Sequence, residues 1–293
     1  VKTDSRGEFE LREHDSFKIN EETSFWHWKS RDVGGKSALD YLVKVEGVKF
    51  VDAVLTLCEK SPSYIPPLSQ PEQKKEFALS PAAANNRRVF AYLMKRGISR
   101  KVIEACVRAG ILYESADYHN AVFVGKDETG TARYAFLRGT YTKGKPFKAE
   151  VSGSEKQYCF CLPPKGKTNR LAVYEAAIET LAHLTLEGSA DKWRLSLGGI
   201  SAPKDGEPSR SFSFKKPLAL ESFLGRHPEI EELEICTNND FAGRWAATCL
   251  EKAYQGRYRI VKNLPEKEGC DYADLTKERY EKQATRQRAT CSR

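Results

Sequence analysis

The chain has 293 residues, of which 40% are hydrophobic and 30% are charged, and its formal net charge is +8. This apolar content excludes a disordered protein, and the length predicts two or three domains. No apolar run reaches the roughly 18 residues of a membrane span, and no signal peptide opens the chain, so we expect a cytoplasmic protein with no membrane partner. The basic surface suits phosphate backbones as partners.

Short elements are predicted in the first part of the chain. Alternating aromatics indicate a strand, and helical spacing of apolar residues indicates helices. The expected elements are a strand over 24–28, a turn at 34–35, helices over 37–45 and 51–58, and a proline-containing linker over 61–85. Gly34-Gly35-Lys36-Ser37 is like the end of a phosphate-binding loop, but that pattern needs a glycine where Ser30 stands, so we predict no ATP site there.

The middle of the chain reads as two helices followed by a hairpin. Helix stop and cap signals at Gly97 and Ser99 separate the helices, and a polar turn separates two apolar strands. The expected elements are helices over 87–96 and 99–108, strands over 121–124 and 132–138, and an extended lysine-rich stretch over 142–148.

From residue 171 strands and helices alternate. The expected strands are 171–174, 193–197, 233–237 and 258–264, the expected helices are 176–186, 217–225 and 241–254, and a basic helical tail follows Lys277. Alternation of this kind predicts a mainly parallel sheet with helices on both faces, in which binding sites form at the carboxyl ends of the strands.

Acidic side chains follow three of these strands. Glu175 comes after the first strand, Asp240 after the third, and Asp271 and Asp274 after the strand that ends at Leu264. One sheet would bring them together, and magnesium or manganese takes such oxygen ligands together with substrate phosphates. Taken alone, Asp240 is also a good cap for the helix that begins at Phe241.

Four motifs carry a definite resemblance. They occur in order as Val-Tyr-Glu-Ala-Ala-Ile-Glu (173–179), Gly198-Gly199, Thr-Asn-Asn-Asp-Phe-Ala-Gly-Arg (237–244) and Gly-Cys-Asp-Tyr-Ala-Asp-Leu (269–275). This order resembles a Toprim domain, the metal-binding fold shared by DnaG-type primases, topoisomerases and some nucleases. The resemblance implies metal ligation by Glu175, Asn238, Asp240, Asp271 and Asp274, with Glu175, Asp240 and Asp271 as the catalytic residues.

Upstream segments are similar to other parts of primases. Residues 86–165 resemble the basic lobe that precedes Toprim, and residues 15–57 look like the tail of a primase zinc ribbon. Trp28-Lys29-Ser30-Arg31 stands where ribbon cysteines would lie, and the chain has no Cys-x-x-Cys, so no zinc is expected. The whole resembles Toprim-containing proteins of bacterial conjugative elements and plasmids.

The fold class that follows is α/β and α+β. The expected domains are a zinc-less ribbon-like region (1–60), a linker (61–85), a primase-like basic lobe (86–165), a Toprim domain (166–276) and a basic tail (277–293).

The sequence departs from the family pattern at two positions. Asn238 is neutral where the family has a charged ligand, and Cys270 replaces a usual lysine. An amide oxygen still coordinates a cation, but one negative charge is lost.

Basic residues are candidates for holding nucleic acid, and aromatics such as Tyr134, Phe136 and Tyr141 interleave with those near the hairpin, as suits single-strand stacking. The same residues also suit solvated helix faces and a hairpin core. The candidates are Arg87, Arg88, Arg96, Arg138, Lys143, Lys145, Lys148 and Arg244.

Three hypotheses follow. The first is a primase-like protein of a mobile element that performs metal-dependent nucleotidyl transfer on DNA, expected to be single-stranded, with nucleotides and other replication or transfer proteins as partners. The second is a Toprim nuclease that uses the same carboxylates. The third, motivated by Asn238, is a DNA-binding module with a relic metal site.

Overall fold

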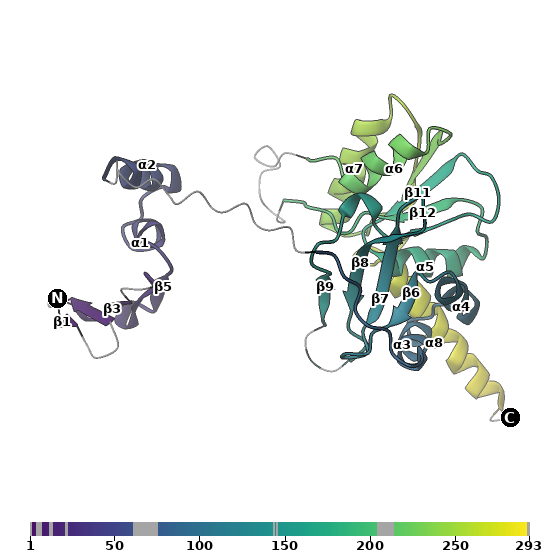
Figure 1. Cartoon of the computed structure of the whole chain (residues 1–293), viewed down its shortest axis with the longest axis horizontal. Coiled ribbons are helices and arrows are strands. Elements are labelled where there is room, and N and C mark those ends of the chain that lie inside the picture. Colours follow the sequence, from purple (N-terminus) through teal and green to yellow (C-terminus); the bar gives the residue numbers. More distant parts are fainter. Residues whose placement is uncertain are drawn as a thin grey trace. The chain divides into compact units, whose positions relative to one another are not determined.

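The computed structural model describes residues 2–3, 8–11, 14–20, 23–60, 76–142, 144, 146–203 and 214–291. The fold class is mixed α/β, as predicted. The chain divides into two compact units, residues 1–73 and 74–293 (Figure 1). Residues 61–75, most of the predicted linker, lie outside the described residues.

The first unit is an antiparallel sheet followed by two helices. Its strands pair in chain order. The strands are β1 Lys2–Thr3, β2 Glu8–Leu11, β3 His14–Asn20, β4 Trp26–Trp28 and β5 Val33–Gly35, and the 3-10 turn η1 Lys29–Arg31 lies between β4 and β5. The helices are α1 Ala38–Lys44 and α2 Phe50–Lys60. Strands β1 to β3 were not predicted, because residues 1–20 are largely polar and the apolar alternation holds only two residues in each run, Phe9 and Leu11 in β2 and Phe17 and Ile19 in β3.

Aromatic rings form the core of the first unit. Phe17 stacks on Trp26 with ring centroids 5.8 Å apart and meets Trp28 edge-on at 5.6 Å. The Gly34-Gly35-Lys36-Ser37 segment runs from the last residues of β5 to the N-cap of α1. Ser37 caps this helix because its hydroxyl oxygen accepts the N–H of Asp40. A helix cap therefore explains the Gly-Gly-Lys-Ser run.

The second unit contains a four-stranded antiparallel sheet in the order β6-β7-β8-β9. The predicted hairpin is confirmed as β7 and β8, in which Phe123 lies opposite Phe136. The bounds are α3 Arg87–Lys95, α4 Arg100–Arg108, β6 Leu112–Glu114, β7 Ala121–Lys126, β8 Ala132–Arg138 and β9 Lys148–Glu150.

The second sheet of this unit is mainly parallel, with the order β10-β12-β11-β13-β14. Strand β10 is antiparallel, whereas β12, β11, β13 and β14 pair in parallel. The bounds are η2 Lys156–Tyr158, β10 Cys161–Leu162, β11 Arg170–Tyr174, α5 Ala177–Glu187, β12 Trp193–Ser196, α6 Leu218–Arg226, β13 Glu232–Ile235, α7 Phe241–Tyr254, β14 Arg259–Lys262 and α8 Tyr272–Cys291. The predicted tail boundary at 277 thus falls inside α8.

Helices cover both faces of this sheet because alternate residues of β11 face opposite sides. Ala172 and Tyr174 belong to the core that contains α5, and Leu171 and Val173 belong to the core that contains α6 and α7. None of the helices in the described part of the chain combines the length and apolar character that a bilayer crossing requires.

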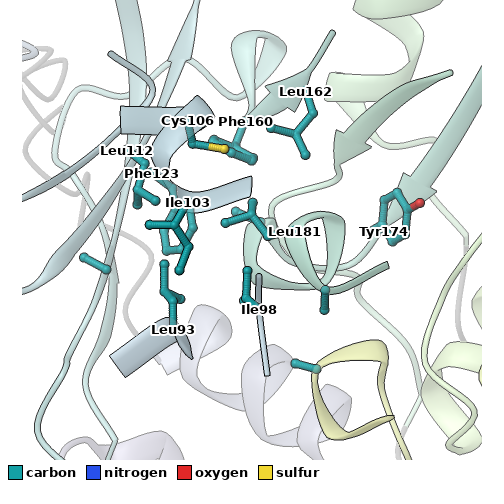
Figure 2. Packing of buried hydrophobic residues seen from close by; sticks show 14 of the residues in the cluster. Leu93, Ile98, Ile103, Cys106, Leu112, Phe123, Phe160, Leu162, Tyr174 and Leu181 are labelled. Atoms are coloured by element: carbon teal, nitrogen blue, oxygen red, sulfur yellow. The ribbon is translucent and has the colours of Figure 1, made fainter. Parts of the chain in front are cut away.

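The predicted basic lobe and the parallel sheet share one core. Leu93 of α3, Ile103 of α4 and Phe123 of β7 pack in the same cluster as Leu181 of α5 (Figure 2). Their side chains are at most 1% exposed. The antiparallel sheet and the parallel sheet are therefore fixed relative to each other by apolar burial, which holds their facing groups in place.

Candidate functional site

Glu175 and Asn238 meet at the carboxyl edge of the parallel sheet, as the strand order predicts. Glu175 directly follows β11, and the segment after β13 continues beside it, where Cys236 N–H donates to Val173 O at 2.9 Å. The backbone N–H of Asn238 donates to Glu175 Oε1 at 3.0 Å. This bond orients the Glu175 carboxylate from the neighbouring strand.

Gly243 allows the turn that presents Asn238. A Cβ on Gly243 would lie 2.0 Å from the backbone oxygen of Asn238, a separation that no side chain permits. Thr237 Oγ1 also donates to Gly243 O at 2.9 Å, which ties the end of β13 to the first turn of α7. The glycine of the second motif is therefore explained by backbone packing.

Asp240 is the N-cap of α7. Its Oδ1 accepts the N–H of Gly243 at 2.7 Å, and the residue is exposed. The capping interpretation of the sequence is thus the one that the contacts show. The other carboxylate oxygen remains a potential ligand, and the Asp240 charge acts on Glu175.

Asp271 and Asp274 bond to each other's backbone at the start of α8. Asp274 N–H donates to Asp271 Oδ1 at 2.7 Å, and Asp271 N–H donates to Asp274 Oδ2 at 3.3 Å. Asp271 is half-buried and lines the cavity described below, whereas Asp274 is exposed. Of this pair, Asp271 is the one placed at the site.

Glu179 is a functional candidate that the sequence analysis did not include among the site residues. It lies four residues after Glu175 in the first turn of α5, is 4% exposed and lines the same cavity. Its Oε2 accepts the N–H of Glu175 at 3.1 Å and of Ala176 at 3.2 Å. The signal was the second glutamate of the first motif, at the third helical position, from which its carboxylate reaches back to the backbone N–H groups before α5.

The carboxyls of Glu175, Glu179 and Asp271 line a cavity of about 360 Å³ that lies between the two sheets of the second unit. Its size fits a small ligand such as a nucleotide. The lining comprises Phe123, Tyr134, Phe136, Arg138, Lys148, Glu175, Ala176, Ala177, Ile178, Glu179, Ser196, Gly198, Gly199, Asn238 and Asp271. The cavity is acidic on the side of the parallel sheet, and Arg138 and Lys148 enter from the antiparallel sheet.

Burial and mutual repulsion make the acidic side unfavourable for negative charge. Burial raises the pKa of the Glu175 carboxyl, as do the charges of Asp240 and Asp271, although the Asn238 N–H opposes the shift. Burial likewise raises the pKa of Asp271 and, more strongly, that of Glu179. The charges of Asp271 and Glu175 raise the pKa of Glu179 further. A bound cation would relieve this crowding.

The predicted basic residues fall into several groups. Arg138 and Lys148 line the cavity, and Arg138 Nε donates to Tyr92 OH at 3.1 Å. Arg244 bonds to Asn239 O at 3.0 Å and pairs with Glu268, so it stabilises the loop before α7. Arg96 is half-buried, Arg87 and Arg88 are exposed on α3, and Lys143 and Lys145 lie outside the described residues.

A second group of potential metal ligands is buried beneath the sheet. Ligand atoms of His183, Glu234 and Cys236 lie within 4.8 Å of one another. However, Glu234 Oε2 already accepts Lys192 Nζ at 2.6 Å, and His183 Nδ1 bonds Tyr174 OH at 2.7 Å. We interpret this group as a charge-balanced structural network.

Comparison with known sequences gives two similarities. Residues 91–167 match the family described as "Protein of unknown function (DUF3991)". An uncharacterized protein of Bacillus anthracis, pXO2-78, is 27% identical over 256 residues, which covers 83% of this chain and 71% of the relative.

Several solved primase structures are similar in arrangement. The zinc-binding and RNA polymerase domains of Aquifex aeolicus primase give a TM-score of 0.44 at 15% identity, covering 98% of this chain and 79% of that one. The primase fragment of the bacteriophage T7 primase-helicase gives 0.45 at 16% identity, covering 93% of each chain. The DnaG primase catalytic domain bound to ssDNA gives 0.43 at 18% identity, covering 67% and 71%. Because each TM-score is below 0.5, we base the function on the chain's own residues.

Proposed function

We propose that this chain is a primase-like nucleic-acid-binding protein that performs magnesium- or manganese-dependent nucleotidyl transfer on DNA. The observation that carries the proposal is the cavity in which the carboxyls of Glu175, Glu179 and Asp271 lie opposite Arg138 and Lys148. Acids on one wall and cations on the other suit a ligand that brings both phosphates and a metal ion.

The donor set fits a hard divalent cation. Glu175, Asp271 and the amide oxygen of Asn238 would hold it, since carboxylate and carbonyl oxygens are the ligands that magnesium and manganese prefer. Such a cation, when bound, neutralises phosphate charge and favours the attacking form of a hydroxyl. Burial raises the pKa of Glu175 and Asp271, neighbouring carboxylates raise it further, and an added positive charge would relieve that repulsion.

The remaining residues position and neutralise the substrate. Arg138 and Lys148 would bind phosphate oxygens, with Arg138 oriented by Tyr92 OH. The Asn238 N–H orients Glu175, and the Glu175 and Ala176 N–H groups orient Glu179. Phe136 and Ile178 supply apolar walls against which a base would pack. Positioning and charge compensation therefore account for the proposed chemistry.

A template-extension assay tests the proposal. The full chain is incubated with single-stranded DNA, nucleoside triphosphates and Mg²⁺ or Mn²⁺. We expect labelled products to lengthen, and Glu175→Gln to reduce synthesis at least about 100-fold because it removes a negatively charged ligand of the cation that neutralises the reacting phosphate. Glu251→Gln is the matched control, since Glu251 pairs with Lys262 on the surface. Shortened strands would instead support the nuclease hypothesis.

Asn238→Asp sharpens the test. It adds a carboxylate to the cavity, and a unit charge about 4 Å away is worth about 1 kcal/mol even in water, or roughly fivefold in affinity. We expect the variant to bind Mn²⁺ at least that much more tightly by calorimetry and to synthesise faster. Equal Mn²⁺ binding by the parent, Asn238→Asp and Glu175→Gln would contradict a metal site here.

One observation favours a binding-only protein. Asp240 and Asp271 both accept backbone N–H groups at helix starts, and Asn238 contributes no charge. Under this alternative, DNA binding survives Glu175→Gln and no divalent metal supports turnover.

A further inference from the structure

Two exposed tyrosines lie on adjacent segments at one end of the antiparallel sheet. Tyr118, in the turn between β6 and β7, is 79% exposed, and Tyr141, just after β8, is 59% exposed. Thr140 Oγ1 donates to His119 O at 2.8 Å, so the two segments are in contact. A single exposed ring is common on protein surfaces, but exposed rings on contacting segments together offer an apolar surface that suits a ligand.

The turn that carries Tyr118 is held in an unfavourable backbone conformation. Tyr118 and His119 have φ angles of 57° and 52°, in the left-handed region that bulky residues rarely adopt. Two bonds close the turn: Ser115 N–H donates to Asn120 O at 2.9 Å, and Asn120 N–H donates to Ser115 Oγ at 3.0 Å.

Buried Glu114 secures this turn to α3. It bonds His119 Nδ1 at 2.6 Å through one oxygen, and its other oxygen accepts the N–H groups of Arg88 and Val89. The fold therefore maintains a tyrosine in solvent at a conformational cost.

Cationic side chains lie on the Tyr141 side of the pair. The Arg88 guanidinium donates to Tyr141 OH and lies 5.3 Å from the ring centroid, and Arg87 is exposed next to it. Rings combined with arginines are the features with which proteins hold single-stranded nucleic acid, the rings stacking on bases and the cations meeting phosphates. Asp117, exposed next to Tyr118, would repel a phosphate there, which favours contact through the base.

One face of α3 leads from these rings to the acidic cavity. Arg88, Tyr92 and Arg96 are spaced four residues apart on one side of α3, where the Tyr92 ring is buried, Arg88 is exposed and Arg96 is half-buried. Tyr92 OH accepts Arg138 Nε, the Arg96 guanidinium lies 5.0 Å from the Tyr92 ring centroid, and Arg96 is close enough for its charge to act on Asp271. The distance from Arg88 to Arg96 along the helix is about 12 Å, or roughly three to four stacked nucleotides at about 3.4 Å each.

We propose that Tyr118 and Tyr141 form a base-stacking platform for single-stranded nucleic acid, which then passes Arg88 and Arg96 along α3 toward the cavity. The platform rests on the proposed function for its ligand class and adds to it a site for the strand remote from the reacting phosphates.

Fluorescence anisotropy with a labelled oligo(dT) of about 16 nucleotides tests the platform in the full chain. We expect Tyr118→Ala and Tyr141→Ala each to weaken binding by roughly 5- to 150-fold, the usual effect of removing one stacking ring. Tyr280→Ala is the matched control, because Tyr280 is an exposed tyrosine on α8 away from the platform, and its affinity should equal the parent's.

Two further measurements separate stacking from misfolding and from charge. Tyr118→Gly places glycine at a positive φ, so its melting temperature should equal or exceed the parent's while binding falls. The slope of log Kd against log salt should be unchanged in the tyrosine variants, whereas Arg88→Ala should reduce it by about one.

The outcomes distinguish the platform from the proposed activity. Parental affinity for oligo(dT) in both tyrosine variants, or no binding by the parent, overturns the platform. Weakened binding in these variants supports the platform even if no template is extended, whereas template extension with parental affinity in both variants would support the activity and overturn the platform.

Discussion

Most acidic side chains at the site bond to backbone as well as facing a possible ligand. Glu175 is held by Asn238 N–H, Glu179 by two N–H groups before α5, and Asp271 by Asp274 N–H. Burial raises the pKa of each carboxyl, and these bonds oppose that shift because they stabilise the ionised form. The same residues therefore define local structure and concentrate negative charge, which explains why either role could be inferred from the sequence.

The buried network around His183 predicts a specific pH dependence. Burial lowers the pKa of His183 to about 4, despite opposing effects of Glu187 and Glu234. Below about pH 6.5, the ordinary pKa of histidine, His183 takes up a proton in the unfolded chain but not in the folded chain. The free energy of unfolding therefore decreases as the pH is lowered. The stabilisation that His183 contributes is fully present only above about pH 6.5.

We expect this residue to lower the free energy of unfolding by about 2 kcal/mol between about pH 7 and pH 5. Urea unfolding of the parent and His183→Gln at both pH values checks the prediction. The curves of free energy against pH should converge for the two proteins toward low pH. Parallel curves would show that His183 titrates normally in the folded state.

At the scale of elements, close backbone contacts position the loops of the site. Gly243 permits the approach of α7 to Asn238, and Gly97, with a φ of 80°, permits α3 to end against the backbone of Thr276 in α8. Thr276 Oγ1 also donates to Arg96 O at 3.0 Å. These contacts join α3 and α8, whose neighbouring course is visible in Figure 1, and so place Arg96 beside Asp271.

Gly243→Ala should therefore disturb the site as well as the fold. The added methyl would meet Asn238 O at 2.0 Å, so the loop after β13 must shift, at a cost of at least about 2 kcal/mol in unfolding free energy. Gly256→Ala is the control, because a Cβ there meets nothing within 4 Å. Equal melting temperatures for the two variants would mean that the loop accommodates the methyl without strain.

At the scale of the molecule, the two compact units have separate cores. Phe17, Trp26 and Trp28 form the core of the unit 1–73, whereas the second unit is held by two larger clusters. The antiparallel sheet β6-β7-β8-β9 and the parallel sheet both belong to the second unit. They share a core that contains buried residues such as Phe123 and Leu181. The acidic and basic walls of the cavity therefore belong to one folding unit.

Calorimetry should resolve this organisation. Leu181→Ala removes a fully buried side chain at a cost of about 2–5 kcal/mol, and we expect it to lower only the transition of the larger unit. Phe17→Leu should lower only the transition of the smaller unit. A single transition shifted by both changes would show that the units unfold together.

Local pattern predicted much of the fold. The alternation of strands and helices after residue 171 was sufficient for the mainly parallel sheet, and the apolar strands around a polar turn for the β7–β8 hairpin. The order of strand ends also predicted that Glu175, Asp240, Asp271 and Asp274 would come together; Glu175 and Asp271 line one cavity, whereas Asp240 and Asp274 are exposed outside its lining. Strands β1 to β3 were missed because their apolar alternation is too short to mark a strand, with only two apolar residues each in β2 and β3.

The sequence by itself determined the parallel sheet, its acidic carboxyl edge and the basic composition, because these depend on periodicity and residue type. Only the tertiary structure decided which charges share a space. Packing of α3, α4 and β7 against α5 places Arg138 and Lys148 opposite Glu175, buries Glu179, leaves Asp240 as an exposed cap and links Tyr118 to α3 through Glu114. These relations depend on long-range contacts and on burial. Both shift the pKa values of the acidic groups, and no local sequence pattern records that environment.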